Sequence, residues 1–261
     1  MNILDKITLD KRNEVALRKG LIPTSQLEQS ILFQRETISL SKRLRNSSSG
    51  IIAEHKRRSP SKSIINNSLN VQDVARGYES AGVCGMSVLT DGKYFGGSLD
   101  DLLTARASCG LPLLRKEFII DDYQILEARA YGADVILLIA AILTRSEIKQ
   151  LSEFAKSLSL EVLLEVHNEE ELNQSMMPSL DMLGVNNRNL KTFDVSLETS
   201  KELSTKIPDE FVKVSESGIS HVSAIKDLKN FRYQGFLIGE NFMKTNNPGE
   251  SATAFIKELE Q

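Results

Sequence analysis

The sequence has few cysteines and no cluster of residues with the spacing of metal ligands. Cys84 and Cys109 are its two cysteines, and neither belongs to a Cys-x-x-Cys pair or a Cys/His cluster. This excludes a disulfide framework and argues against structural zinc. Both flank small apolar residues, so we expect buried free thiols, which suit the reducing cytoplasm. A chain of 261 residues can bury a large core without such staples.

Long apolar runs and a surplus of positive charge are also absent. No window approaches the roughly 18 apolar residues of a membrane-spanning helix, and the N-terminal segment 1–19 is charged throughout, unlike a signal peptide. The net charge is −3, whereas nucleic-acid binders usually carry a basic surplus. The dense basic cluster Lys56-Arg57-Arg58 borders an apolar run, so we interpret it as part of an anion pocket. We therefore expect a cytoplasmic protein without membrane or nucleic-acid partners.

What the chain does contain is a regular succession of short runs rich in Val, Ile and Leu. Several, such as VILLIA at 135–140, are apolar on both faces, which is typical of strands in parallel sheets. Their spacing fits one strand, one crossover helix and two loops per unit. The eight predicted strands are Ile51–Ala53, Met86–Leu89, Pro112–Arg115, Val135–Ile139, Glu161–Glu165, Met182–Val185, Phe211–Val214 and Phe236–Ile238.

Amphipathic helix patterns lie between these runs. Asn70 is placed to cap one helix, and T-R-S-E from Thr144 is the signature of a capping box. The predicted helices are Val71–Ser80, Tyr123–Tyr131, Thr144–Ser157, Ser220–Leu228 and Glu250–Leu259. Eight β-then-α units predict a single α/β domain, a (β/α)8 TIM barrel, over residues 46–261. The rival, an open doubly wound sheet, usually has G-x-G-x-x-G after its first strand, and no glycine stands there.

The first 45 residues are not needed to build the barrel. Leu4–Arg18 and Gln26–Phe33 have helical patterns, and Arg43–Gly50 is polar and serine-rich, as expected of a linker. We predict that residues 1–45 form a helical extension that packs on the barrel near its mouth and shields the substrate.

Ionisable and amide side chains concentrate where the predicted strands end. In a TIM barrel the active site lies at this end of the strands. Strand residues alternate between faces, so Glu54 and Lys56 share the interior while His55 faces the helices. Glu54 and Lys56 should then meet Lys116 and Glu165, and crowding should lower the pKa values of the lysines toward useful acid–base values. The further strand-end residues are Asn186, Asn187, Arg188 and Glu216.

Two glycines in the last two units predict a phosphate site. TIM barrels often bind phosphate through backbone N–H groups that follow strands seven and eight. The seventh strand ends in S-E-S-G-I and the eighth in I-G-E-N-F, so Gly218 and Gly239 allow close approach of the backbone. Ser59 and Ser217 could donate hydroxyl groups. The predicted ligand is therefore a small phosphorylated molecule.

Taken together and in order, seven segments resemble the indole-3-glycerol phosphate synthase family. The match runs from about residue 2 to the C-terminus, and E-x-K-R-x-S-P-S and R-K-E-F separate it from other phosphate-binding barrels. The segments are IIAEHKRRSPSKS (51–63), LTDGKYFGGSLDDL (89–102), LLRKEFIIDDYQI (113–125), LLEVHNEEEL (163–172), LGVNNRNLKTF (183–193), VSESGI (214–219) and FLIGENFMK (236–244).

The resemblance implies a decarboxylating, dehydrating ring closure of 1-(2-carboxyphenylamino)-1-deoxyribulose 5-phosphate in tryptophan biosynthesis, without metal or organic cofactor. Lys116 would protonate the ketone, and Glu165 would be a base or stabilise the cationic intermediate. Lys56 would bind the carboxylate or act as an acid in dehydration, oriented by Glu54, which could also remove a proton. The remaining implied contacts are Asn186 to a ribulose hydroxyl, Arg188 near the carboxylate, Ser59, Ser217, Gly218 and Gly239 to phosphate with Glu216 among the substrate-binding residues, and Phe95, Phe118, Leu137 and Leu190 around the aromatic ring.

Two positions need comment. Ser63 stands where family members often have glycine, which could alter the loop after the first strand. Glu240 follows Gly239, and because a carboxylate would repel phosphate we expect it to point away.

Two other functions were weighed against this interpretation, and the sequence also raises the question of partner proteins. Phosphoribosyl anthranilate isomerase would need a Cys/Asp pair at strands one and four, where Glu54, Lys56 and Ala140-Ala141 stand instead. A non-catalytic scaffold would show gaps among the charged positions, and there are none. We expect a monomer that at most associates weakly with other enzymes of tryptophan biosynthesis.

Overall fold

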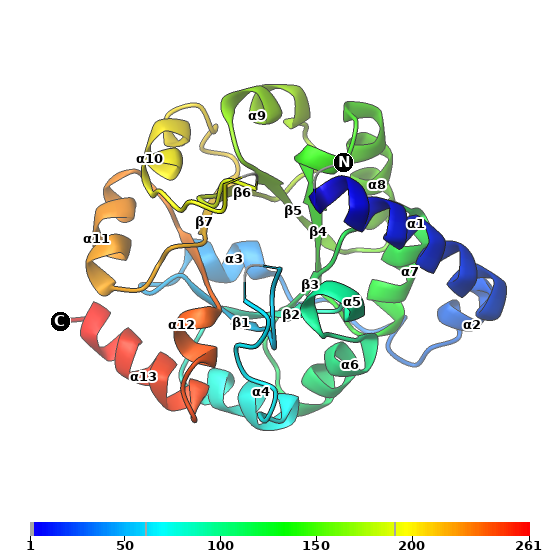
Figure 1. Cartoon of the computed structure of the whole chain (residues 1–261), viewed down its shortest axis with the longest axis horizontal. Helices are drawn as coiled ribbons and strands as arrows, with labels where there is room; N and C mark the ends of the chain where they lie inside the picture. Colours follow the sequence, from blue (N-terminus) through cyan, green and yellow to red (C-terminus); the bar gives the residue numbers. More distant parts are fainter. Residues whose placement is uncertain (1–2, 61, 191) are drawn as a thin grey trace.

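Eight parallel strands close into a barrel in the computed structural model, which describes residues 3–60, 62–190 and 192–261. Each strand pairs with the next along the chain, and the eighth pairs with the first (Figure 1). This confirms the predicted TIM barrel. The strands are β1 Ile51–His55, β2 Gly85–Leu89, β3 Leu113–Lys116, β4 Val135–Ile139, β5 Glu161–Val166, β6 Met182–Asn186, β7 Val212–Glu216 and β8 Gly235–Ile238.

The strands are apolar on both faces because each face is covered. Alternate residues such as Leu137 and Leu163 fill the barrel interior. Their neighbours, such as Ile136 and Val162, pack instead against the surrounding helices. All five residues of β4 are buried, so its unbroken apolar run follows from its position between two cores.

A ring of helices surrounds the barrel. Each of the five helices predicted after the first strand is found within two residues of its expected ends. Asn70 caps its helix by accepting a hydrogen bond from the N–H of Gln72. The predicted capping box of Thr144 and Glu147 is present. The elements are α4 Val71–Ser80, α5 Gly92–Phe95, α6 Leu99–Ser108, α7 Asp122–Ala130, η1 Ala140–Ile142, α8 Arg145–Ser157, α9 Glu169–Ser175, α10 Glu198–Ser204, α11 Val222–Asn230, α12 Glu240–Met243 and α13 Pro248–Leu259.

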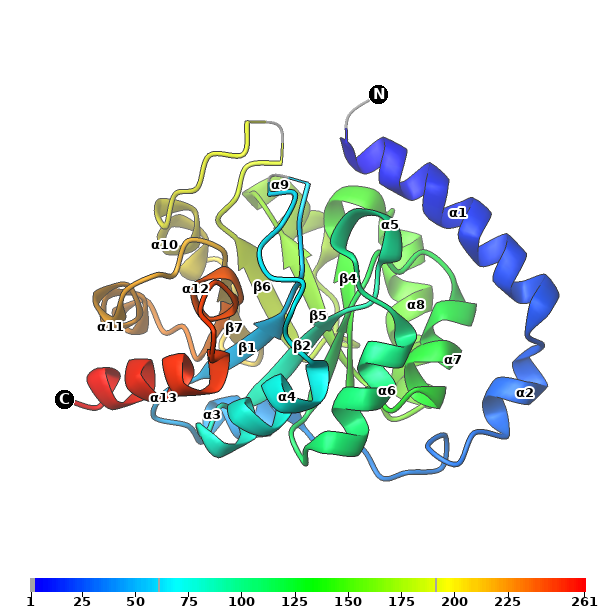
Figure 2. The same ribbon diagram turned by 60° about the horizontal axis from the view of Figure 1, so that its bottom comes forward.

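The N-terminal segment places helices at both ends of the barrel. Helix α1 (Ile3–Leu21) crosses the edge of the mouth and α2 (Thr24–Glu28) descends the side, whereas α3 (Leu40–Arg45) lies beneath the strands (Figure 2). The predicted helix Gln26–Phe33 was too long, since α2 ends at Glu28. The interpretation of Arg43–Gly50 as a linker was wrong for its first residues, which end α3. Within the described ranges, no helix has the length and apolar character needed to cross a membrane.

Candidate active site

A cavity of about 360 Å³ opens at the carboxyl ends of the strands. Helix α1 contributes Ile3, Leu4 and Ile7 to its wall. Every residue predicted to bind substrate or take part in catalysis lines this one cavity, because strands far apart in the sequence all end at the same face of a barrel. These residues are Glu54, Lys56, Ser59, Phe95, Lys116, Phe118, Leu137, Glu165, Asn186, Arg188, Leu190, Glu216, Ser217, Gly218 and Gly239. The strand-end Asn187 does not line it and is instead hydrogen-bonded to Ser215 and Ser200.

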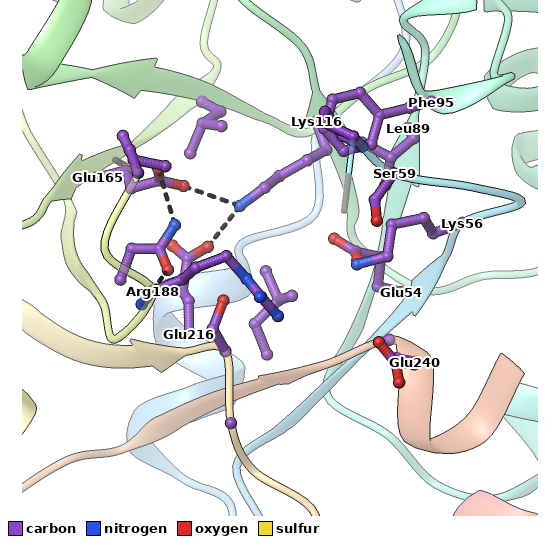
Figure 3. Close-up of a pocket in the computed structure, with 18 of the residues that line it drawn as sticks. Glu54, Lys56, Ser59, Leu89, Phe95, Lys116, Glu165, Arg188, Glu216 and Glu240 are labelled. Carbon is purple, nitrogen blue, oxygen red and sulfur yellow. Dashed lines mark hydrogen bonds and ion pairs between the residues drawn. The ribbon is translucent and has the colours of Figure 1, made fainter. Parts of the chain in front are cut away.

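Lys116, at the end of β3, reaches across the barrel and lies between two carboxylates from β5 and β7. Its Nζ is 3.1 Å from Oε2 of Glu165 and donates a second, short hydrogen bond to Glu216 (Figure 3). The amide of Asn186 donates to Oε1 of Glu165 at 3.1 Å, so that carboxylate is held from two sides. The three strands β3, β5 and β7 thus bring together an ammonium and two carboxylates.

A second ammonium–carboxylate pair lies at the end of β1. Lys56 Nζ is 2.6 Å from Oε1 of Glu54, and both side chains face the cavity. A Cβ atom at Gly239 would lie 2.5 Å from the same Glu54 oxygen, so a glycine is needed there to leave room for the carboxylate. His55 is buried and lies near Arg57 and Asp101 of α6 rather than the cavity, as alternation predicts. Burial lowers the pKa of His55 to about 4, aided by Arg57.

The charges of the site shift one another's protonation. Burial disfavours the ammonium of Lys116, but Glu216 and Glu165 outweigh it and raise the pKa of Lys116 above its ordinary range. Burial likewise opposes the ionised form of Glu165, but Lys116, His167 and Asn186 lower its pKa. The expectation that crowding lowers the lysine pKa values was therefore wrong for Lys116, which faces carboxylates. Lys116 therefore stays positively charged and Glu165 negatively charged.

Glu216 differs from Glu165 although both contact Lys116. Burial raises the pKa of Glu216, and the negative charges of Glu165 and Glu54 add to that effect against the opposing attraction of Lys116. Its Oε1 atom is buried without a hydrogen-bond partner among the residues that the structure describes. Glu216 is thus the carboxylate of this cluster that accepts a proton most readily.

Apolar side chains form a slot on the β2–β4 side of the cavity. The rings of Phe95 and Phe118 lie 5.9 Å apart between centroids with planes tilted by 43°. Leu137 lines the cavity from β4, and Leu190 lines it from the loop after β6. A flat aromatic ring can pack against such a surface while its charged substituents reach the lysines.

Backbone N–H groups and hydroxyls gather at the opposite end, after β7 and β8. Ser217 and Gly218 both have positive φ, 69° and 81°, and α12 begins directly after Gly239. We expected Glu240 to point away, yet it lines the cavity and its Oε1 is 2.5 Å from Lys62 Nζ. Its charge is therefore countered by a lysine from the loop after β1.

Other residues near the site escaped prediction. The His167 ring lies 3.1 Å from Glu171 Oε2 and 3.4 Å from Glu165 Oε1. Burial favours the neutral ring, but these two carboxylates raise the pKa of His167 to about 10. Phe193 and Lys244 also line the cavity. Lys244 could have been found from its place one helical turn after Glu240. The approach of His167 to Glu165 could have been found from their spacing of two residues at the end of β5, which places both side chains on one face.

The fold and this cavity define a TIM-barrel enzyme that acts on a small anionic molecule. No group of three or more potential metal ligands occurs in the described part of the chain. The family model for indole-3-glycerol phosphate synthase matches residues 4–259. The chain belongs to that family.

Similar proteins agree with this assignment. An indole-3-glycerol phosphate synthase of Bacteroides thetaiotaomicron is 46% identical over 259 residues, which cover 99% of each chain. One of Polaromonas sp. is 43% identical over 252 residues, 95% of this chain and 96% of the relative. Among solved structures, 3-hexulose-6-phosphate synthase from Salmonella typhimurium superposes with a TM-score of 0.65 over 81% of this chain and 99% of the other. At 13% identity this likeness shows the fold alone.

Proposed function

We propose that the protein converts 1-(2-carboxyphenylamino)-1-deoxyribulose 5-phosphate into indole-3-glycerol phosphate, CO2 and water. The observation that carries this proposal is the position of Lys116 between Glu165 and Glu216, beside an apolar slot. A charged acid there can protonate a ketone whose carbon is attacked by a ring packed in the slot. Family membership supports the same reaction.

The first step forms the new carbon–carbon bond. The ring carbon that bears the carboxylate attacks the ketone carbon, and Lys116 gives its proton to the ketone oxygen, which becomes a hydroxyl. The ring is then cationic, and the ionised Glu165 stabilises that charge. Asn186 orients Glu165 and binds a ribulose hydroxyl. Breaking the bond to the carboxylate releases CO2 and returns its electron pair to the ring.

Dehydration completes the indole. The hydroxyl formed from the ketone leaves as water with a proton from Lys56, and a carboxylate removes the proton that restores aromaticity. Glu54 and Glu165 are the two candidates for this base. Before decarboxylation, Lys56 and Arg188 hold the substrate carboxylate. This assignment is supported by the 2.6 Å pair of Glu54 and Lys56.

The phosphate of the substrate occupies the end of the cavity after β7 and β8. The supporting features are the hydroxyls of Ser59 and Ser217 and the backbone at Gly218 and Gly239, all of which line the cavity. In the N-terminal extension α1 shields the substrate, supported by Ile3, Leu4 and Ile7, which line the cavity, whereas α3 closes the opposite end of the barrel. We further propose a cytoplasmic monomer, with weak association with other enzymes of the pathway at most. Its two cysteines are buried free thiols, which suits that compartment.

Indole fluorescence provides a direct test. Purified protein mixed with the substrate should develop the fluorescence of indole-3-glycerol phosphate, with release of one CO2 per product. Lys116→Met should slow turnover by about 10²-fold or more if Lys116 is the general acid. No fluorescence at micromolar wild-type enzyme would refute the function, and an unchanged rate in the variant would remove the role of Lys116.

A further inference from the structure

Lys11 is a buried lysine on α1, outside the barrel proper. Its side chain is only 3% exposed, and its Nζ lies 3.0 Å from both Asp91 Oδ2 and Glu117 Oε1. Glu14 of the same helix is 2.8 Å away. Lysines are almost never fully buried unless they are paired. Here the two barrel partners are themselves buried carboxylates at the ends of β2 and β3.

Both carboxylates also hold the backbone of the aromatic slot. Asp91 Oδ1 accepts hydrogen bonds from the N–H groups of Tyr94 at 2.6 Å and Phe95 at 3.2 Å. Glu117 Oε1 accepts the N–H of Phe118 at 2.9 Å. One ammonium group is therefore linked, through one carboxylate each, to the two phenylalanines whose rings face each other in the cavity.

We propose that Lys11 is a positioning residue that sets the spacing of Phe95 and Phe118 and so determines the affinity for the aromatic ring of the substrate. This proposal rests on the proposed function, because it assigns the slot to the carboxyphenyl ring. Lys11 touches no reacting atom and acts through Asp91 and Glu117.

Electrostatics explain why the spacing depends on this lysine. Asp91 and Glu117 both lie within 3.0 Å of one ammonium and are shielded from water. Without that positive charge Glu117 would keep the more distant guanidinium of Arg115, 3.8 Å away, but no cation would lie between the two buried carboxylates. They would then separate, since like charges in a poorly solvated site repel strongly. Burial disfavours the charged ammonium, yet Glu117 and Asp91 raise the pKa of Lys11 above its ordinary range. The lysine therefore stays charged throughout the working pH range.

Anchoring of α1 to the barrel does not by itself explain why Lys11 is buried between two carboxylates. The far half of the helix is tied to the barrel by Arg18, which pairs with the buried Glu127, and by Lys19, which lies 2.7 Å from Asp121. Asp10, the neighbour of Lys11, accepts from Lys93 at 2.7 Å and from Tyr94. What distinguishes Lys11 is that its partners hold Phe95 and Phe118.

The test separates ring binding from phosphate binding and from folding. Lys11→Met would be compared with Lys19→Met, which removes an exposed ion pair of the same helix, and with Lys11→Arg, which keeps the charge. For each variant we would measure kcat, KM, the melting temperature and the Kd of a reduced substrate analogue in which the ketone is an alcohol. The inhibition constant of inorganic phosphate would report the opposite end of the cavity.

Lys11→Met should raise KM and the analogue Kd about tenfold, the scale of a lost apolar contact in a binding pocket, with kcat within about threefold. The phosphate constant should stay within about twofold. Lys11→Arg should recover part of the affinity, and Lys19→Met should leave all constants unchanged. If Lys11→Met does not fold, Lys11→Gln replaces it, and at least a threefold rise in KM is expected.

Unchanged KM and Kd in a folded neutral variant would overturn the proposal, even with a lower melting temperature, since Lys11 would then be an anchor only. An equal loss of phosphate affinity would also overturn it, because the loss of affinity would then not be specific to the aromatic ring of the substrate. The analogue Kd needs no turnover. If the wild-type protein binds the analogue but does not form product, the proposed function fails while the role of Lys11 is still decided.

Discussion

Two glutamates on one strand behave differently because they lie at opposite ends of the barrel. Glu161 begins β5 and Glu165 lies near its end, and residues four apart on a strand share a face. At the lower end, Glu161 Oε2 accepts the N–H groups of Leu40 and Ser41 at 2.9 Å, and Oε1 accepts the hydroxyl of Ser41 at 2.7 Å. It is therefore surrounded by donors from α3.

Glu165, at the upper end, shares its donors with competing carboxylates. It contacts Lys116 and Asn186, but Lys116 also binds Glu216. Beneath the strands the leucines of α3, Leu40 and Leu44, are 0% and 1% exposed and fill the barrel. The lower end thus surrounds the carboxylate of Glu161 with donors and closes with apolar side chains. The upper end leaves charge unmatched around an open cavity, which is the arrangement needed for proton transfer.

Glu165→Gln should give the largest effect and should fall on activity alone. Loss of the carboxylate removes the group proposed as base or as stabiliser of the cationic intermediate, so kcat should fall by about 10²- to 10⁴-fold. Stability should change by less than about 1 kcal/mol, because the lost attraction to Lys116 is offset by relief of the repulsion on Glu216. Indole fluorescence and urea unfolding measure the two quantities. A large loss of stability would show that both ends of β5 serve folding.

Glu161→Gln is the matched change at the other end of the strand. The amide oxygen of Gln can still accept from the N–H groups of Leu40 and Ser41, but the negative charge that strengthens these hydrogen bonds is lost, so the free energy of unfolding should fall by about 1 to 2 kcal/mol. The kinetic constants should be unaffected at temperatures where the variant is folded. Urea unfolding and initial rates at 20 °C below the melting temperature provide the measurement. A drop in kcat with unchanged stability would reverse the division between the two ends.

His55 extends the comparison to the two faces of β1, since its neighbour Glu54 faces the cavity. Its pKa is lowered to about 4 from 6.5, chiefly by burial. Between these values the unfolded chain binds a proton that the folded chain does not, so stability falls as the pH decreases from 6.5 toward 4. The contribution should reach about 2 kcal/mol near pH 4.5.

His55→Gln removes this titration. The difference in unfolding free energy between pH 7 and pH 4.5 should then be smaller than in the wild-type protein by about 2 kcal/mol. Equal pH dependence in both proteins would mean that His55 is protonated in the folded state or that other groups dominate. Either result would show whether the helix-facing side of β1 contributes to the acid sensitivity of the fold.

The sequence allowed the barrel and its site to be predicted because both depend on local patterns and on one topological rule. Runs such as VILLI identify strands, and the closed barrel then places Lys116, Glu165 and Glu216 at one mouth whatever their separation along the chain. Helix α3 was missed for the opposite reason. It has six residues, too few for a periodic pattern, and its stability comes from contacts of Leu40 and Leu44 inside the barrel.

Ion pairs between residues far apart in the chain could not be predicted from the sequence either. Charged residues at strand ends could be enumerated, but which ammonium faces which carboxylate depends on side-chain geometry. The pKa of Lys116 was expected to fall and instead rises, because its contacts are Glu165 and Glu216 rather than another lysine. Lys11 could not be assigned either, since Asp91 and Glu117 approach it only after α1 packs across the mouth.

Lys62 provides the smallest test of the contrast between the two ends. Its pair with Glu240 is exposed, with 55% and 41% of the two side chains accessible, so Lys62→Met should change stability by less than about 1 kcal/mol. The uncovered charge of Glu240 should repel the substrate phosphate and raise KM by about fivefold at low salt, an effect that 0.5 M salt should largely screen. Lys62→Met combined with Glu240→Gln should restore KM, because the repelling charge is then gone. A stability loss above 2 kcal/mol with unchanged KM would instead make this pair a structural contact, and the upper end of the barrel would then share the role assigned here to α3 and Glu161.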